Sequence, residues 1–130
     1  NSNDSSCVIR VSNGRFSILM PGDISTRVER QLIKHYGQRL QSTVLVAPHH
    51  GSNSSSSPAF IATVKPQYVI YSSGFLNRYQ FPRAKVVARY ADAVQLNTAD
   101  SGQLSFTLTE SQLDWQQART DLMPQWFYNQ

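Results

Sequence analysis

The chain has 130 residues, 40% of them hydrophobic, and a formal net charge of +4. This length and apolar content fit one folded domain and exclude a disordered chain, and no apolar run approaches the about 20 residues that a membrane helix needs. The only cysteine, Cys7, excludes an internal disulfide, and the mild basic excess permits nucleic-acid contact without requiring it.

Patterns of apolar residues predict strands that alternate with helices along most of the chain. Strand-like runs occupy residues 7–11, 15–20, 43–47, 68–72, 94–97 and 103–109. Helical patterns occupy residues 26–36, 58–65 and 82–90. Strand, helix and strand in this order favour parallel pairing within one sheet.

Two local signals refine this assignment. Asn13 and Gly14 separate the first two strands, and this dipeptide is typical of a type I′ hairpin turn. Thr26 and Glu29 have the spacing of a capping box at the start of the first helix.

The most informative stretch is the double histidine that follows the strand at residues 43–47. Pro48 and Gly51 break the chain there, so His49 and His50 are delivered at a strand end. Neutral imidazole is the commonest metal ligand in proteins, so this setting favours metal ligands; the alternative is a pair of histidines satisfied by local hydrogen bonds.

A carboxylate stands in a similar place after the preceding strand. Asp23 follows the apolar run 16–20 and Pro21-Gly22. A carboxylate and an imidazole at neighbouring strand ends suit a divalent ion such as zinc or manganese. The alternative is a helix N-terminal cap, because Ser25 and Thr26 follow closely.

These motifs together resemble a known family. Met20-Pro-Gly-Asp23 followed by Val46-Ala-Pro-His-His-Gly-Ser52 resembles the second half of a metallo-β-lactamase-type domain. More narrowly, it resembles the C-terminal domain of ComEC-type competence proteins, the inner-membrane channels of DNA uptake. The likeness runs in order from about residue 3 to about residue 108 through the segments 55–58, 64–66, 71–74, 77–79 and 98–102.

The chain also departs from that family. Its main metal motif, His-x-Asp-x-Asp-His, is absent, and Phe81 stands where the family often has a histidine. The resemblance therefore implies the C-terminal half of a larger domain: an α/β fold that is part of an αββα sandwich, with one mixed sheet and helices on its outer face. We accordingly divide the chain into residues 1–109, which form this half-domain, and a tail at residues 110–130.

The resemblance also implies a metal site and a substrate surface. Asp23, His49 and His50 are the expected catalytic residues, with Asp23 bridging two ions, His50 as a ligand and His49 toward the substrate. The larger domain would hold zinc or manganese, whereas this chain alone is expected to bind them weakly or not at all and to be inactive. Expected substrate contacts follow strand ends: Ser52, Asn77, Arg78 and Tyr79.

Other residues leave alternatives open. Residues 77–79 could be a structural turn instead of a substrate contact. A basic segment has Tyr79 and Phe81 interleaved with its charges, which are Arg78, Arg83, Lys85 and Arg89. This segment could contact a phosphate backbone while the aromatic rings stack on bases, or it could be an ordinary charged helix face. The tail could form a loose amphipathic helix interrupted by Pro124, with apolar positions at Leu113, Ala118, Leu122, Trp126 and Phe127.

Three functions are compatible with these features. The first is a metal-dependent nuclease domain of a DNA-uptake channel, which would degrade the strand that is not imported. The second is a non-catalytic DNA-binding or assembly module of the channel, and the third is a metallo-phosphoesterase with a small substrate. Implied partners are DNA, the missing first half of the domain, the channel portion and a second copy of this chain, on the extracytoplasmic side of an inner membrane.

Overall fold

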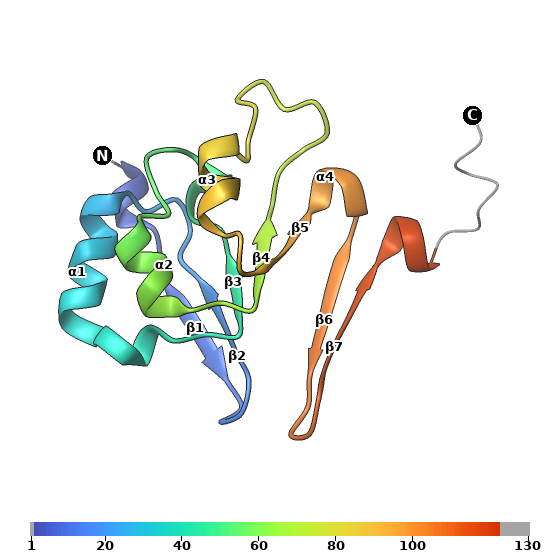
Figure 1. Ribbon diagram of the computed structural model, residues 1–130, viewed down its shortest axis with the longest axis horizontal. Helices are drawn as coiled ribbons and strands as arrows, with labels where there is room; N and C mark the ends of the chain where they lie inside the picture. The colour runs from blue at the N-terminus through green and yellow to red at the C-terminus, as the bar shows by residue number, and fades with distance from the viewer. Residues whose placement is uncertain (1, 123–130) are drawn as a thin grey trace.

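One mixed sheet organises the molecule. The structure, a computed structural model, describes residues 2–122 (Figure 1). Five strands lie side by side in chain order: β1 (Ile9–Ser12), β2 (Ser17–Met20), β3 (Val44–Val46), β4 (Tyr68–Tyr71) and β5 (Val94–Asn97). β1 runs antiparallel to β2, and the other neighbours are parallel. The predicted α/β class with a mixed sheet is confirmed.

Helices cover one face of this sheet. They are α1 (Thr26–Tyr36), α2 (Pro58–Val64) and α3 (Ala84–Arg89), with a single turn, α4 (Thr98–Ser101), after β5. Figure 1 shows α1 and α2 on one side of the strands. The core lies between these helices and the sheet and is formed by Leu19, Leu40, Leu45, Ala47, Phe60, Val64, Val69, Tyr71, Val86 and Tyr90. No helix within residues 2–122 has the length and apolar content to cross a membrane.

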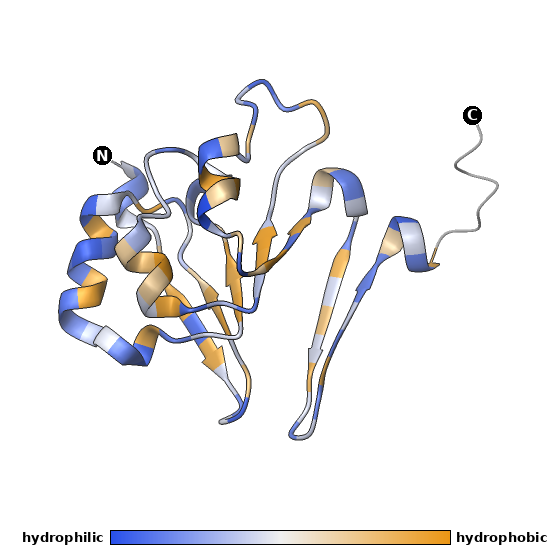
Figure 2. Cartoon of the chain, viewed as in Figure 1, coloured by the Kyte–Doolittle hydropathy of each residue, from blue (hydrophilic) through white to orange (hydrophobic). Residues whose placement is uncertain are grey.

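A β-hairpin of β6 (Leu104–Leu108) and β7 (Leu113–Gln117) stands on the other side of the sheet (Figure 1). Tyr68 of β4 contacts it through Phe106 and Trp115, with ring centroids 5.8 and 6.3 Å apart. In Figure 2 the hydrophobic residues of β6 alternate with more polar ones. This period of two favours a strand over a helix.

The helix expected in the tail is therefore wrong for residues 113–117, which pair with β6. A turn at 109–112 makes this pairing possible, because the Thr109 N–H donates to the Gln112 carbonyl over 2.9 Å. The division that we placed after residue 109 falls in this turn. A short π-helical turn, Ala118–Leu122, follows, and Pro124, Trp126 and Phe127 lie outside the described residues.

Both local signals act differently from their predictions. Glu29 is fully buried and makes no capping box with Thr26; its carboxylate accepts the N–H groups of Ser56 and Ser57 over 2.5 and 2.9 Å. The β1–β2 hairpin forms as expected, but its turn is not type I′, since that turn needs two positive φ angles. Gly14 has φ +93°, but neither Asn13 nor Arg15 has a positive φ. The turn is held instead by the Asn13 side chain, which accepts the N–H groups of Arg15 and Phe16.

Candidate functional site

Three loops meet at the carboxyl ends of β2, β3 and β4. They comprise residues 21–23, 48–51 and 72–81, and parallel strands bring such ends to one edge of the sheet. The His49 N–H donates to the Gly22 carbonyl over 3.0 Å, and this bond joins the first two loops. Between the loops lies an open cleft of about 500 Å³, lined by Asp23, His49, His50, Ser72, Ser73, Gly74, Asn77, Tyr79 and Phe81.

The double histidine has an unusual backbone. His49 and His50 both adopt positive φ, +49° and +56°. Non-glycine residues in this region cost about 1–3 kcal/mol each and persist only where the surroundings hold them. Gly51 supplies part of that restraint, because a Cβ there would lie 2.6 Å from Cβ of Pro82 and 3.0 Å from the Tyr71 ring. The turn is thus packed so closely that both imidazoles are presented from a fixed backbone.

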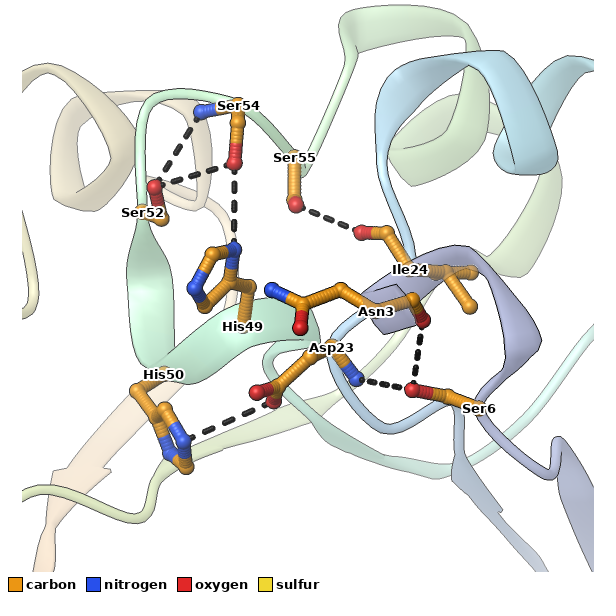
Figure 3. Close-up of polar contacts among 9 residues, drawn as sticks. All are labelled: Asn3, Ser6, Asp23, Ile24, His49, His50, Ser52, Ser54 and Ser55. Carbon is orange, nitrogen blue, oxygen red and sulfur yellow. Dashed lines mark hydrogen bonds and ion pairs between the residues drawn. The ribbon is translucent and has the colours of Figure 1, made fainter. Parts of the chain in front are cut away.

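Asp23 and His50 face each other across the cleft (Figure 3). His50 Nε2 lies 3.5 Å from Asp23 Oδ1, which is longer than an ordinary hydrogen bond. Both side chains are partly exposed, and the Asp23 N–H donates to Ser6 Oγ over 3.1 Å. The carboxylate therefore comes from an anchored backbone and keeps its oxygens available to a ligand.

This separation fits two ligands of one divalent ion. Ligand distances near 2.1 Å in a tetrahedral zinc site place neighbouring donors about 3.4 Å apart. A catalytic zinc ion usually takes three protein ligands. Within residues 2–122, no group of three histidine, cysteine, aspartate or glutamate side chains is placed to hold a metal. Asp23 and His50 thus fit part of a metal site.

His49 points to a different partner. Its Nδ1 lies 3.1 Å from Ser54 Oγ, and Ser54 is linked to Ser52 by a hydroxyl–hydroxyl hydrogen bond of 3.0 Å (Figure 3). The His49 ring also makes an edge-to-face contact with the Phe81 ring, with ring centroids 5.7 Å apart. His49 therefore lines the cleft without facing Asp23.

Aromatic rings continue from His50 along the third loop. Phe81 stacks on His50 with centroids 6.4 Å apart, and Tyr79 stacks on Phe81 at 5.5 Å with only 18° between the planes. The guanidinium of Arg78 lies 4.8 Å from the centre of the Tyr79 ring. Asn77 holds the loop closed, since its side chain both donates to the Phe81 carbonyl and accepts from the Phe81 N–H, each over 2.8 Å.

Most of the expected site residues thus converge, although their roles stay predictions. Of the expected substrate contacts, Asn77 and Tyr79 line the cleft, whereas Ser52 and Arg78 do not. Three lining residues, Ser72, Ser73 and Gly74, had no expected site role, whereas Phe81 was considered only as a surface for stacked bases. Ser72 ends the predicted strand 68–72, and Ser73 and Gly74 follow it directly, so their position at this strand end was the available signal.

The basic segment divides into two parts. Arg89 is a structural residue, because its Nη1 donates to the carbonyls of Ser55 and Ser56 over 3.3 and 2.9 Å. Arg83 instead lies beside the cleft, with its guanidinium 5.8 Å from the centre of the Phe81 ring. The expectation that Arg89 meets a phosphate backbone is therefore not supported, while Arg83 keeps a suitable position.

Two tyrosines lie beneath this region. Burial raises the pKa of Tyr71 and of Tyr90 far above the usual range of a phenol. The Tyr71 hydroxyl donates to Gln95 over 2.6 Å, and that of Tyr90 donates to Ser56 over 2.9 Å. Both phenols thus stay neutral and serve as hydrogen-bonded core groups.

The chain is similar to segments of larger proteins. Over 82% of its length, the chain is 44% identical to a segment that makes up 16% of "Competence protein ComA" of Neisseria gonorrhoeae. It is 38% identical over 96% of its length to 16% of "Recombination protein 2" of Haemophilus influenzae, and 34% identical over 97% to 17% of "Uncharacterized protein YcaI" of Escherichia coli. The chain therefore spans about a sixth of these relatives' length. No protein-family model matches it.

These findings correct the family named from the sequence. None of the three relatives is named as a metallo-β-lactamase or a ComEC protein, and no metallo-β-lactamase model matches. The identification as the second half of a metallo-β-lactamase-like domain of a ComEC-type protein is therefore withdrawn. That identification depended on the motifs around Asp23 and His50, and in the structure these motifs bring together only two side chains that could bind one metal ion. The similarity that stands is to segments of competence and recombination proteins.

Proposed function

We propose that this chain is a DNA-contacting segment of a competence protein that acts in DNA uptake. The observation that carries the proposal is the 44% identity to a segment of "Competence protein ComA", which covers 82% of this chain. The cleft supports it, because polar strand-end residues meet exposed aromatic and arginine side chains there. Phosphate contacts by arginine provide most non-specific affinity for DNA, and stacking adds to it.

DNA binding by the chain tests this proposal. We expect fluorescence anisotropy of a labelled oligonucleotide to rise with protein at low salt, and the affinity to fall with added salt as counterions are released. Arg83→Ala should weaken binding and reduce the salt slope by about one. The matched control is Arg30→Ala, an exposed arginine of α1 away from the cleft. Equal effects of the two substitutions, or no binding by the unaltered chain, would count against the proposal.

A second candidate is metal-dependent hydrolysis of DNA or of a smaller phosphodiester. The observation that favours it is the 3.5 Å between His50 Nε2 and Asp23 Oδ1. A divalent ion held there with further ligands from outside the described residues would activate a water and stabilise the leaving oxygen of a phosphodiester. Asp23 and His50 would hold the ion, and His49 would bind and orient the substrate phosphate.

Metal titration tests this second candidate. The chain alone should bind manganese or zinc weakly, and Asp23→Asn and His50→Gln should remove that binding. His35→Gln is the control, because His35 is exposed on α1 and its Nδ1 lies 2.7 Å from the Gln31 carbonyl. Cleavage of labelled single- and double-stranded DNA with added manganese provides the second readout. Binding and cleavage that both survive in the Asp23 and His50 variants would contradict the metal assignment.

A further inference from the structure

The loop at residues 74–81 has more exposed apolar surface than its own packing requires. Tyr79, Phe75 and Leu76 are 52%, 70% and 86% exposed. Asn77 and Gln80 nevertheless give the loop a defined shape, since the Gln80 N–H donates to the Asn77 carbonyl over 3.0 Å. An ordered loop that presents aromatic surface to solvent is typical of a binding element.

The chain segment that contains this loop carries charge of one sign, whereas Asp23 and Asp100 from other segments lie beside it. Residues 72–91 contain four basic side chains, Arg78, Arg83, Lys85 and Arg89, and no aspartate or glutamate. Arg89 is held by loop carbonyls, but the guanidinium of Arg78 lies over Tyr79 and that of Arg83 lies near Phe81. The ligand that suits flat aromatic surface among positive charges is a planar ring attached to an anion.

We propose that Tyr79 is a stacking platform for an unpaired nucleobase, which makes the cleft selective for single-stranded DNA. This inference rests on the proposed function and deepens it. The stacked order Tyr79, Phe81 and His50 leads from solvent to the cleft. Phe81 stacks on Tyr79, and the guanidinium of Arg78 lies over the Tyr79 ring and donates to its hydroxyl over 2.6 Å. A base on Tyr79 would therefore take the place of that guanidinium, which would then pair with a neighbouring phosphate, and Arg83 would lie near the next phosphate. A base inside a duplex is covered on both faces by its neighbours, so it cannot use this platform without leaving the stack.

The test compares three DNA ligands bound to the full chain. They are a labelled single strand of about 12 nucleotides, the same strand paired in a duplex, and an abasic strand with the same number of phosphates. Tyr79→Leu should weaken binding of the normal single strand about tenfold, which is within the range for loss of one stacked base. It should leave the abasic strand unchanged, and Tyr79→Trp should restore affinity for the normal strand.

Tyr36 offers a matched control. It is 49% exposed, and the guanidinium of Arg39 lies 5.2 Å from its ring centre, so its surroundings resemble those of Tyr79 at a site on α1. Tyr36→Leu should bind all three DNAs as the unaltered chain does. Tyr79→Leu that binds the normal strand with full affinity, or that loses the normal and abasic strands equally, would overturn the platform. Failure of the unaltered chain to bind any of the three would instead overturn the proposed function itself.

Discussion

The two faces of the sheet differ in what covers them. On one face, Leu19, Leu45 and Val69 pack beneath the helices and are at most 1% exposed. The strand pairing places another set of residues on the opposite face, namely Ile9, Val11, Ile18, Met20, Val44, Val46, Tyr68, Ile70, Val94 and Leu96. We call this set the open face. It is apolar at every one of these positions, and Figure 1 shows α1, α2 and α3 on the other side of the sheet; Val44 and Leu96 of this set are nevertheless buried.

An apolar face of this size is informative because antiparallel sheets that meet water alternate polar with apolar residues. Here both faces of β3 and β4 are apolar, which is the pattern of strands covered on both sides. The β6–β7 hairpin covers the part around Tyr68, while Ile9, Val11 and Val94 remain 47%, 54% and 48% exposed. The open face therefore suits a further contact, with another part of a longer protein or with a second copy.

The largest expected effect lies on the helical side. Glu29→Ala removes a buried carboxylate and leaves the N–H groups of Ser56 and Ser57 without their acceptor. We expect a loss of about 3 kcal/mol in the free energy of unfolding, since buried donors without partners are costly. Urea unfolding followed by circular dichroism measures it. Glu110→Ala, at an exposed carboxylate, is the control, and equal midpoints for the two variants would contradict the role of Glu29.

A matched pair of valines compares the two faces directly. Val69 on the helical face is fully buried, whereas Val11 on the open face is 54% exposed. Val69→Ala should lower the free energy of unfolding by about 2 kcal/mol through lost burial and a cavity. Val11→Ala should change it by less than about 0.5 kcal/mol in dilute solution. Similar losses from both substitutions would mean that the open face is already covered in the isolated chain.

The open face should drive association at higher concentration. We expect light scattering to detect dimers of the chain, because exposed apolar patches promote contact. Replacing Ile9 and Val11 together by serine should weaken dimerisation about tenfold or more, as about 1.4 kcal/mol of apolar burial is lost. The control is Tyr36→Ser, an equally exposed apolar position outside the sheet. A chain that stays monomeric and binds no apolar dye would argue that this face needs no partner.

Much of the fold follows from the sequence because it depends on local patterns. Apolar runs and breakers such as Pro48 and Gly51 are read directly, so the sheet strands and the loop with His49 and His50 were predicted. The failure at Glu29 involves a long-range contact. Glu29 has the spacing of a local cap, yet its partners lie 27 and 28 residues away, and no local signal reveals that contact.

At the site, too, features set by local sequence were predicted and features set by distant contacts were not. Strand-end residues such as Asp23 and His50 were predicted to meet because parallel strands end at one edge. The inward position of Phe81 and the structural role of Arg89 were not predictable, since both depend on the path of a loop. β7 was missed because a period of two over five residues competes with a weak helical pattern in the same segment.

The smallest expected effect is a pH dependence of stability that arises on the helical side of the sheet and not on the open face. Asp4 ties the first residues to α1, since its carboxylate accepts the Ser25 N–H over 3.1 Å and pairs with Arg27 at 2.9 Å. These two contacts lower its pKa from 3.8 to about 2. A depressed pKa means that ionised Asp4 stabilises the fold fully above about pH 4, and that this contribution is lost as the pH falls toward 2.

Thermal unfolding between pH 5 and about pH 2 should therefore be less pH-dependent in Asp4→Asn than in the unaltered chain. Asp92→Asn, at an exposed carboxylate after α3, should keep the dependence of the unaltered chain. The open face contains no aspartate, glutamate or histidine, so the Asp4→Asn substitution should leave the dimer equilibrium at pH 5 unchanged. A change in that equilibrium would mean that the segment tied by Asp4 also helps to cover the open face.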